Sequence, residues 1–106
     1  VVGLNTDSSV RRLKGPSRPV VDQDDRAVVM AALAVVDYVC LFSEDTPLEL
    51  ITAIVPDVLV KGADWPIDKV VGREVVESAG GRVQAIEFVP DRSTTSIIDR
   101  IRSSGR

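Results

Sequence analysis

The sequence predicts an α/β fold in which a mostly parallel sheet is flanked by helices. Short apolar segments alternate along the chain with segments of helical periodicity, which is typical of parallel strands with helical connections. Aromatic residues make up only 4% of the chain, so Val, Ile, Leu and Ala are expected to build the core. The valine content favours strands buried on both faces. No repeat or long linker interrupts the pattern, which predicts one domain over residues 1–106.

The first half of the chain is expected to form a strand, two helices and a second strand. Val1–Asn5 is the first strand, and Thr6–Leu13 is a short helix with Thr6 or Asp7 as its N-cap. A basic loop rich in glycine and proline separates this helix from the next one. The second strand is the continuous apolar run Tyr38–Phe42.

Asp22–Ala34 is the clearest helix in the sequence. Asp22 can cap it, and the acidic residues that follow suit the positive end of the helix dipole. On local grounds, Arg26 would pair with Asp22 or Asp25. The apolar face of the helix is expected to consist of Val28, Val29, Ala32 and Leu33.

The second half continues the alternation of strands and helices. Thr46-Pro47-Leu48-Glu49 is interpreted as a capping box with proline at the first helical position, opening a helix to about Ala53. The remaining expected elements are a strand over Asp57–Val60, a helix over Arg73–Ala79, a strand over Arg82–Val89 and an amphipathic helix after Ser93.

The composition is that of an ordinary soluble globular protein, with 44% hydrophobic and 27% charged residues. The net charge is −3 and the cations are spread along the chain, so no basic field of the kind that drives nucleic-acid binding is present. No apolar run is long enough to cross a membrane. We therefore expect neither nucleic acid nor a membrane as partner, and a cytoplasmic location. Cys40 is interpreted as a small buried hydrophobe.

The absence of histidine excludes several kinds of chemistry within this chain. Histidine acid–base catalysis, Ser-His-Asp triads and His-ligated metal sites all require this residue. We therefore predict no catalytic residue and no metal ligand within residues 1–106. Any chemistry must use Lys, Arg, Asp, hydroxyls and backbone amides, or a group supplied from elsewhere.

Candidate ligand-binding residues are those that directly follow the expected strands, because ligands of open α/β sheets bind beyond the carboxyl ends of the strands. Two of these segments carry a cation beside small or hydroxylic residues, which suits a polyanionic ligand. The segments are Asn5-Thr6-Asp7, Ser43-Glu44-Asp45, Lys61-Gly62-Ala63-Asp64-Trp65 and Pro90-Asp91-Arg92-Ser93-Thr94-Thr95.

The run Arg92–Ser96 is the most informative of them. Hydroxyls at a helix N-terminus, together with unbonded backbone amides and the helix dipole, form a ready site for phosphate. Arg92 could add bidentate contacts to phosphate oxygens. The alternative is that Ser93 is a plain N-cap, since Ser and Thr are common there for stability alone.

The other candidates are weaker when each is taken alone. Gly62 would let the backbone turn or approach a ligand, and Lys61 offers a point charge to a phosphate; the alternative is an exposed strand end. Lys14 lies in a basic loop of a kind that is common on protein surfaces. For Asp7 the alternative is a helix cap.

Taken in order, several stretches resemble the cytidylyltransferase-like family of nucleotidyltransferases, which implies a Rossmann-like fold. Leu13-Lys14-Gly15, Val70-Val71-Gly72 and Gly80-Gly81 look most like the adenylyltransferase domain of ADP-heptose synthases. The resemblance covers all 106 residues. The stretches are Asn5-Thr6-Asp7, Arg11-Arg12-Leu13-Lys14-Gly15, Asp25-Arg26 with Val36-Asp37-Tyr38-Val39, residues 56–65, and Arg92-Ser93-Thr94-Thr95-Ser96-Ile97-Ile98.

The resemblance implies a reaction and a set of binding residues. D-glycero-β-D-manno-heptose 1-phosphate would attack ATP, helped by Mg²⁺, to give ADP-heptose and pyrophosphate for the lipopolysaccharide core. Substrate-side roles would fall to Asp7, to Lys14 as neutraliser of phosphate charge, and to Arg26, which would orient phosphate or brace its loop. Nucleotide- or phosphate-binding roles would fall to Lys61, Gly62, Asp64, Trp65, Arg92, Ser93, Thr94 and Thr95.

The chain departs from the family pattern in one large respect. The family's signature is a His-x-Gly-His segment after an earlier strand, and the chain contains no histidine. Residues 1–106 are therefore expected to be the C-terminal part of a single nucleotidyltransferase domain that lacks its N-terminal strand, and to be inactive alone. A homodimer, common in the family, and a fused or separate heptose kinase domain remain open as partners.

Two other interpretations of the function also stay open. One is a cytidylyltransferase for a polyol or amino-alcohol phosphate, because base choice depends on pocket shape. The other is a non-catalytic nucleotide-binding or assembly module that keeps the phosphate site without the histidines.

Overall fold

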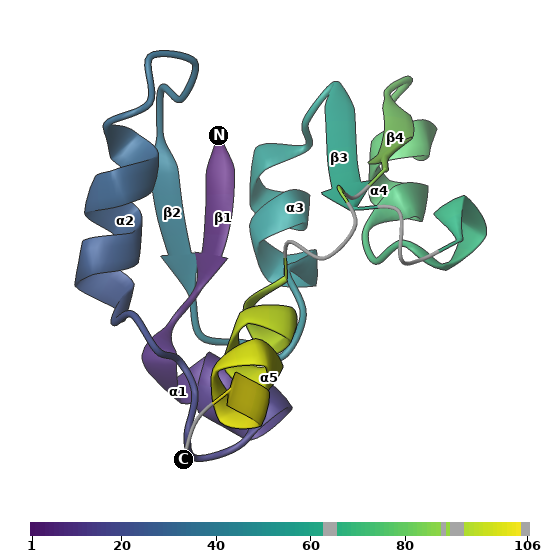
Figure 1. The fold of residues 1–106 in the computed structure, drawn as a ribbon. Coiled ribbons are helices and arrows are strands. Elements are labelled where there is room, and N and C mark those ends of the chain that lie inside the picture. Colours follow the sequence, from purple (N-terminus) through teal and green to yellow (C-terminus); the bar gives the residue numbers. More distant parts are fainter. Residues whose placement is uncertain (63–65, 88, 90–92, 105–106) are drawn as a thin grey trace. The chain divides into compact units, whose positions relative to one another are not determined.

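The structure, a computed structural model, describes residues 1–62, 66–87, 89 and 93–104. It divides into two compact units, Val1–Val55 and Pro56–Arg106, which are described in turn. Parallel strands alternate with helices along the chain, so the predicted Rossmann-like α/β fold class is confirmed (Figure 1). The assignment of the chain to the C-terminal part of one domain stays a prediction.

The first unit is built on a pair of parallel strands in direct register, from Val2 opposite Val39 to Asn5 opposite Phe42. Two helices connect these strands, and a third follows them (Figure 1). The elements are β1 (Val2–Asn5), α1 (Asp7–Lys14), α2 (Gln23–Ala31), β2 (Val39–Phe42) and α3 (Leu48–Ile54).

Both connecting helices begin at predicted side-chain caps. The Thr6 hydroxyl accepts a hydrogen bond from the backbone N–H of Ser9 at 3.4 Å, and the Asp22 carboxylate accepts one from Asp25 at 2.9 Å. Such caps satisfy N–H groups that the first turn of a helix leaves without an acceptor. Asp7 is therefore the first residue of α1 rather than its cap.

The predicted apolar face of α2 is wrong. Val28 and Val29 are 68% and 62% exposed, and the helix ends at Ala31 instead of Ala34. The half-buried residues of α2 are spaced three or four positions apart, so they share the opposite face of the helix, and α2 contacts β1 and β2. They are Gln23, Arg26, Ala27 and Met30.

Helix α3 packs on β1 through a glycine. Phe42 and Ile51 are the buried apolar side chains described in this unit. At Gly3, an added Cβ would lie 3.0 Å from Cδ2 of Leu50 and 3.5 Å from the Phe42 ring. A side chain on this residue of β1 would therefore push against the helix.

The start of α3 differs from the predicted capping box. Pro47 occupies the N-cap position instead of the first helical position, and no side chain caps the helix. The Pro47 carbonyl accepts a hydrogen bond from the N–H of Ile51 at 2.9 Å. The helix therefore begins one residue later than expected, which leaves Thr46 outside the capping position.

The second unit also contains a parallel strand pair, with Val58 opposite Arg82 and Gly62 opposite Ile86. The first of its strands extends two residues past the prediction, and the second ends at Ile86 instead of Val89. None of the helices described has the length and apolar character needed to cross a membrane. The elements are β3 (Val58–Gly62), the 3-10 helix η1 (Ile67–Lys69), α4 (Arg73–Ser78), β4 (Arg82–Ile86) and α5 (Thr94–Ser104).

Among the described residues of this unit, helix α4 covers one face of the β3–β4 pair. Helix α4 contacts both strands and contributes the fully buried Val76. Val58, Val60 and Ile86 are 40%, 52% and 53% exposed. The prediction of strands buried on both faces is therefore wrong for this pair.

Gly81 allows a close approach between the α4–β4 turn and the residues before β3. Its N–H donates to the Val76 carbonyl, and the next N–H, that of Arg82, donates to the Asp57 carbonyl, both at 2.9 Å. An added Cβ would lie 2.6 Å from that Asp57 oxygen and 2.7 Å from Cγ1 of Val76. These distances are shorter than any van der Waals contact, so a side chain would force the turn apart.

Gly81→Ala is expected to destabilise the protein by roughly 1–3 kcal/mol, because the turn must move to admit the methyl group. Urea denaturation measures the free energy of unfolding. Ser78→Ala, at an exposed position of α4, is the matched control and should change it by less than about 0.5 kcal/mol. Equal stability of Gly81→Ala and the wild type would contradict the close approach.

Candidate functional site

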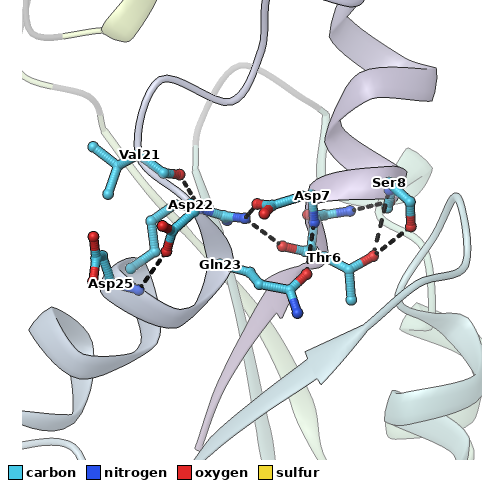
Figure 2. A network of polar contacts seen from close by, with 10 residues as sticks. Thr6, Asp7, Ser8, Val21, Asp22, Gln23 and Asp25 are labelled. Atoms are coloured by element: carbon cyan, nitrogen blue, oxygen red, sulfur yellow. Dashed lines mark hydrogen bonds and ion pairs between the residues drawn. The ribbon is translucent and has the colours of Figure 1, made fainter.

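A network of polar contacts at the carboxyl end of β1 joins the starts of α1 and α2 (Figure 2). Arg26 lies at its centre. Its Nη2 donates to the carbonyl oxygen of Asn5 at 2.9 Å and to Oδ1 of Asp7 at 3.0 Å, and its Nε donates to the Val21 carbonyl at 2.9 Å. The prediction that Arg26 pairs with Asp22 or Asp25 is therefore wrong, since its partner is Asp7.

The ion pair between Arg26 and Asp7 is largely shielded from solvent. The two side chains are 23% and 22% exposed. Charged hydrogen bonds in partly buried positions stabilise more than exposed pairs do. The pair also lies at the N-terminus of α1, where a carboxylate is favoured by the helix dipole.

Gln23 makes a second contact to Asp7, which the sequence did not reveal. Its Oε1 accepts a hydrogen bond from the backbone N–H of Asp7 at 2.9 Å (Figure 2). This N–H belongs to the first turn of α1 and has no acceptor within the helix. The two residues are 16 positions apart, so the contact depends on how α2 docks and leaves no local pattern in the sequence.

A buried serine ties α1 to the segment after β2. Ser9 is fully buried, and its hydroxyl donates to the Glu44 carbonyl at 3.1 Å. The same oxygen accepts from Nδ2 of Asn5 at 2.9 Å. Ser9 was not a predicted site residue, and a serine within a helix gives no sign of this bridging role.

Arg12 adds a second tie between the same elements. Its Nε donates to Oδ1 of Asp45 at 3.0 Å, and its Nη2 donates to the Ser43 carbonyl. The Ser43–Asp45 segment was a candidate ligand-binding loop. In the structure its described contacts hold α1 in place.

The resulting site presents one carboxylate in a fixed position. Among the residues that the structure describes, Asp7 is bonded through its backbone N–H and through Oδ1, but not through Oδ2. A carboxylate only accepts hydrogen bonds, so Oδ2 suits a ligand with hydroxyl donors. Nε and Nη2 of Arg26 are occupied by contacts within the protein.

Lys14 is not brought to this network. It is the last residue of α1, and Asp7 is the first. At a rise of about 1.5 Å per residue the two lie roughly 10 Å apart along the helix axis. Lys14 is exposed, and its charge suits the negative end of the helix dipole.

The predicted residues of the second unit are only partly described. Lys61 is exposed on β3 opposite Ala85, and Gly62 pairs with Ile86. Both residues therefore belong to the strand, of which Gly62 is the last residue. Asp64, Trp65 and Arg92 lie outside the described residues.

The start of α5 combines a helix cap with exposed hydroxyls. Ser93 Oγ accepts a hydrogen bond from the N–H of Ser96 at 3.0 Å and lies 2.9 Å from the Ser96 hydroxyl. Ser93 thus has the position and bonding of an N-cap. Thr94 and Thr95 are exposed in the first turn, and no hydrogen bond of their hydroxyls occurs within the described part of the chain. The first-turn hydroxyls and amides can therefore face an anion.

Neither a metal cluster nor a disulfide marks a site in the described ranges. Over residues 1–62, 66–87, 89 and 93–104, no three His, Cys, Asp or Glu side chains gather as metal ligands. Cys40 on β2 is a free thiol and is half-buried instead of fully buried.

Arg26→Lys is expected to lower the free energy of unfolding by roughly 1–2 kcal/mol, because an ammonium cannot reach the three acceptors that the guanidinium spans. Thermal or urea denaturation measures the loss. Arg11→Lys, at an exposed position of α1, is the matched control and should be neutral. A loss of equal size in both variants would argue against the network.

Ser93→Ala is expected to cost about 1 kcal/mol and to fray the first turn of α5, since the N–H of Ser96 loses its acceptor. Amide hydrogen exchange at Ser96 reports the fraying directly. Thr94→Ala removes a neighbouring hydroxyl that accepts no helix N–H among the described residues, so the Ser96 amide should exchange as slowly in that variant as in the wild type. Unchanged exchange in Ser93→Ala would show that Ser93 is not the cap.

Comparison with known proteins identifies the family. The family model described as cytidylyltransferase-like matches residues 1–103. The chain is 60% identical over 101 residues to the bifunctional protein HldE of Trichlorobacter lovleyi, covering 95% of this chain and 21% of that protein. It is 62% identical over 103 residues to HldE of Mesorhizobium japonicum, covering 97% and 21%. The chain thus spans about a fifth of the length of these relatives. It belongs to the cytidylyltransferase-like family.

Proposed function

We propose that this chain is part of an adenylyltransferase that transfers AMP from ATP to D-glycero-β-D-manno-heptose 1-phosphate. The match to the cytidylyltransferase-like family over residues 1–103 supports nucleotidyl transfer. The identity of about 60% to bifunctional HldE proteins supports a role in heptose synthesis, and the choice of ATP and heptose 1-phosphate follows the sequence resemblance to ADP-heptose synthases. A homodimer, a fused or separate heptose kinase domain, a cytoplasmic location and a role in lipopolysaccharide core synthesis belong to the same proposal.

In the proposed reaction, a phosphate oxygen of the sugar phosphate attacks the α-phosphorus of ATP. A new oxygen–phosphorus bond forms, the bond between the α-phosphorus and the bridging oxygen breaks, and pyrophosphate leaves. Such a transfer depends on positioning and on neutralising negative charge. ATP enters as its Mg²⁺ complex, and no protein ligand is assigned to this ion because the described residues gather no metal-binding cluster.

The phosphates of ATP are assigned to the start of α5. The hydroxyls of Thr94 and Thr95 and the first-turn amides would donate to phosphate oxygens, while Ser93 caps the helix. Lys61 would supply a positive charge, and Gly62 would allow close approach of the backbone. Family position alone gives nucleotide-binding roles to Asp64, Trp65 and Arg92.

The sugar is assigned to Asp7. An anionic carboxylate repels phosphate but accepts hydrogen bonds from sugar hydroxyls, and Oδ2 is the oxygen that Arg26 does not engage. Arg26 would therefore brace the loop that presents Asp7. Lys14 would neutralise phosphate charge from the other end of α1.

The proposal is tested by titrating ATP and CTP, with Mg²⁺, into this chain and into the complete gene product, and by assaying pyrophosphate release with heptose 1-phosphate. The complete protein is expected to bind ATP and to turn over. This chain alone, which has no histidine, is expected to show negligible turnover. The Thr94→Val/Thr95→Val variant should bind ATP about tenfold more weakly, a difference of about 1.4 kcal/mol, without losing stability.

The control variant and the other outcomes separate the remaining interpretations. Thr52→Val, which changes an exposed threonine on α3, should leave ATP binding intact. A preference for CTP would move the assignment to a cytidylyltransferase for a polyol or amino-alcohol phosphate. Nucleotide binding without turnover by the complete protein would indicate a non-catalytic module, and a folded protein that binds neither nucleotide would refute the proposal.

A further inference from the structure

We infer that Gln23 is a positioning residue for Asp7 and thereby tunes recognition of the acceptor sugar phosphate, an inference that rests on the proposed function. Gln23 does not reach the ligand in this assignment. It acts on the residue that does, through the hydrogen bond of 2.9 Å from the Asp7 N–H to its Oε1.

Gln23 and Arg26 hold Asp7 at two different points. Gln23 binds its main chain, and Arg26 binds its carboxylate at 3.0 Å. The two side chains are three residues apart on α2, so they project from the same side of one helix. With one contact to its main chain and one to its carboxylate, the Asp7 side chain is fixed in both position and orientation. The orientation of Oδ2 is therefore set by Gln23 and Arg26 together.

The consequences of removing each anchor differ. Without Arg26 the carboxylate loses its charge partner, and the carbonyl oxygens of Asn5 and Val21 each lose a donor. Without the Gln23 acceptor the ion pair can persist, but the first turn of α1 loses its tie to α2. The carboxylate can then shift together with Arg26, and a shift of about 1 Å is enough to weaken a positioned contact strongly.

The chemistry of glutamine suits this role. Its amide oxygen accepts the hydrogen bond without adding a negative charge beside Asp7 and Arg26. A carboxylate in its place would compete for the guanidinium, and three aspartates already surround this position in the sequence, namely Asp22, Asp24 and Asp25.

The test is steady-state kinetics of the complete gene product with Gln23→Met, which preserves the length of the side chain but removes the acceptor. The KM for heptose 1-phosphate is expected to rise about fivefold to tenfold, the size expected when the hydrogen bond from the sugar to Asp7 is lost. The KM for ATP should stay close to that of the wild type, while the melting temperature should fall by only a few degrees, because the Asp7 N–H loses its acceptor. Gln84→Met, on an exposed position of β4, is the matched control and should change neither KM.

The outcomes separate this inference from the proposed function. An unchanged KM for heptose 1-phosphate, or an equal rise in both KM values, would overturn the role of Gln23 while the transferase assignment stands. If the wild type failed to transfer AMP to heptose 1-phosphate, both would fall. If Gln23→Met did not fold, Gln23→Asn, which keeps the amide but withdraws it by one methylene, should show the same selective rise.

Discussion

The first unit depends on the docking of the N-terminal turn of α2 against the end of β1. Arg26 bonds the carbonyl oxygens of Asn5 and Val21 as well as the carboxylate of Asp7, so one guanidinium joins a strand end, a helix start and a loop. Backbone carbonyls at a strand end need partners when they are removed from water. A single planar group with several donors meets that need for two segments at once.

Helix α1 is also tied down on its other side. Ser9 and Arg12 tie the opposite face of this helix to the Ser43–Asp45 segment, which follows β2. Helix α1 is therefore held between the start of α2 and the loop after β2. In the proposed transfer, which depends on positioning, this frame would hold Asp7 in place for the acceptor.

Local features of the fold could be predicted from the sequence, because neighbouring residues determine them. The caps at Thr6 and Asp22 each satisfy an N–H three residues away, and the structure contains both. The α/β alternation and the parallel pairing were also predicted correctly. At Thr46–Glu49 the predicted capping box is wrong. The sequence has the residue types of a capping box, but Pro47 occupies the N-cap position in place of Thr46, and no side chain caps the helix.

Features that depend on tertiary docking could not be predicted in this way. The side of α2 that faces the strands carries Gln23 and Arg26 next to Ala27 and Met30, so the apolar spacing in the sequence points to the exposed valines instead. The partner of Arg26 was misassigned for the same reason, since two aspartates lie nearer in sequence than Asp7 does. Of the candidate site, the sequence identified Asp7 and Arg26 but gave no sign that they touch, nor that Gln23 completes the contact.

The contact from Gln23 has a consequence for how such a protein can diversify. Because Gln23 binds the main chain of residue 7, this anchor is indifferent to the side chain found there. Any residue other than proline would present the same N–H to α2. A substitution at residue 7 would keep this main-chain contact but would remove the ion pair with Arg26, so an exchange of the carboxylate would have to be matched by a change at residue 26.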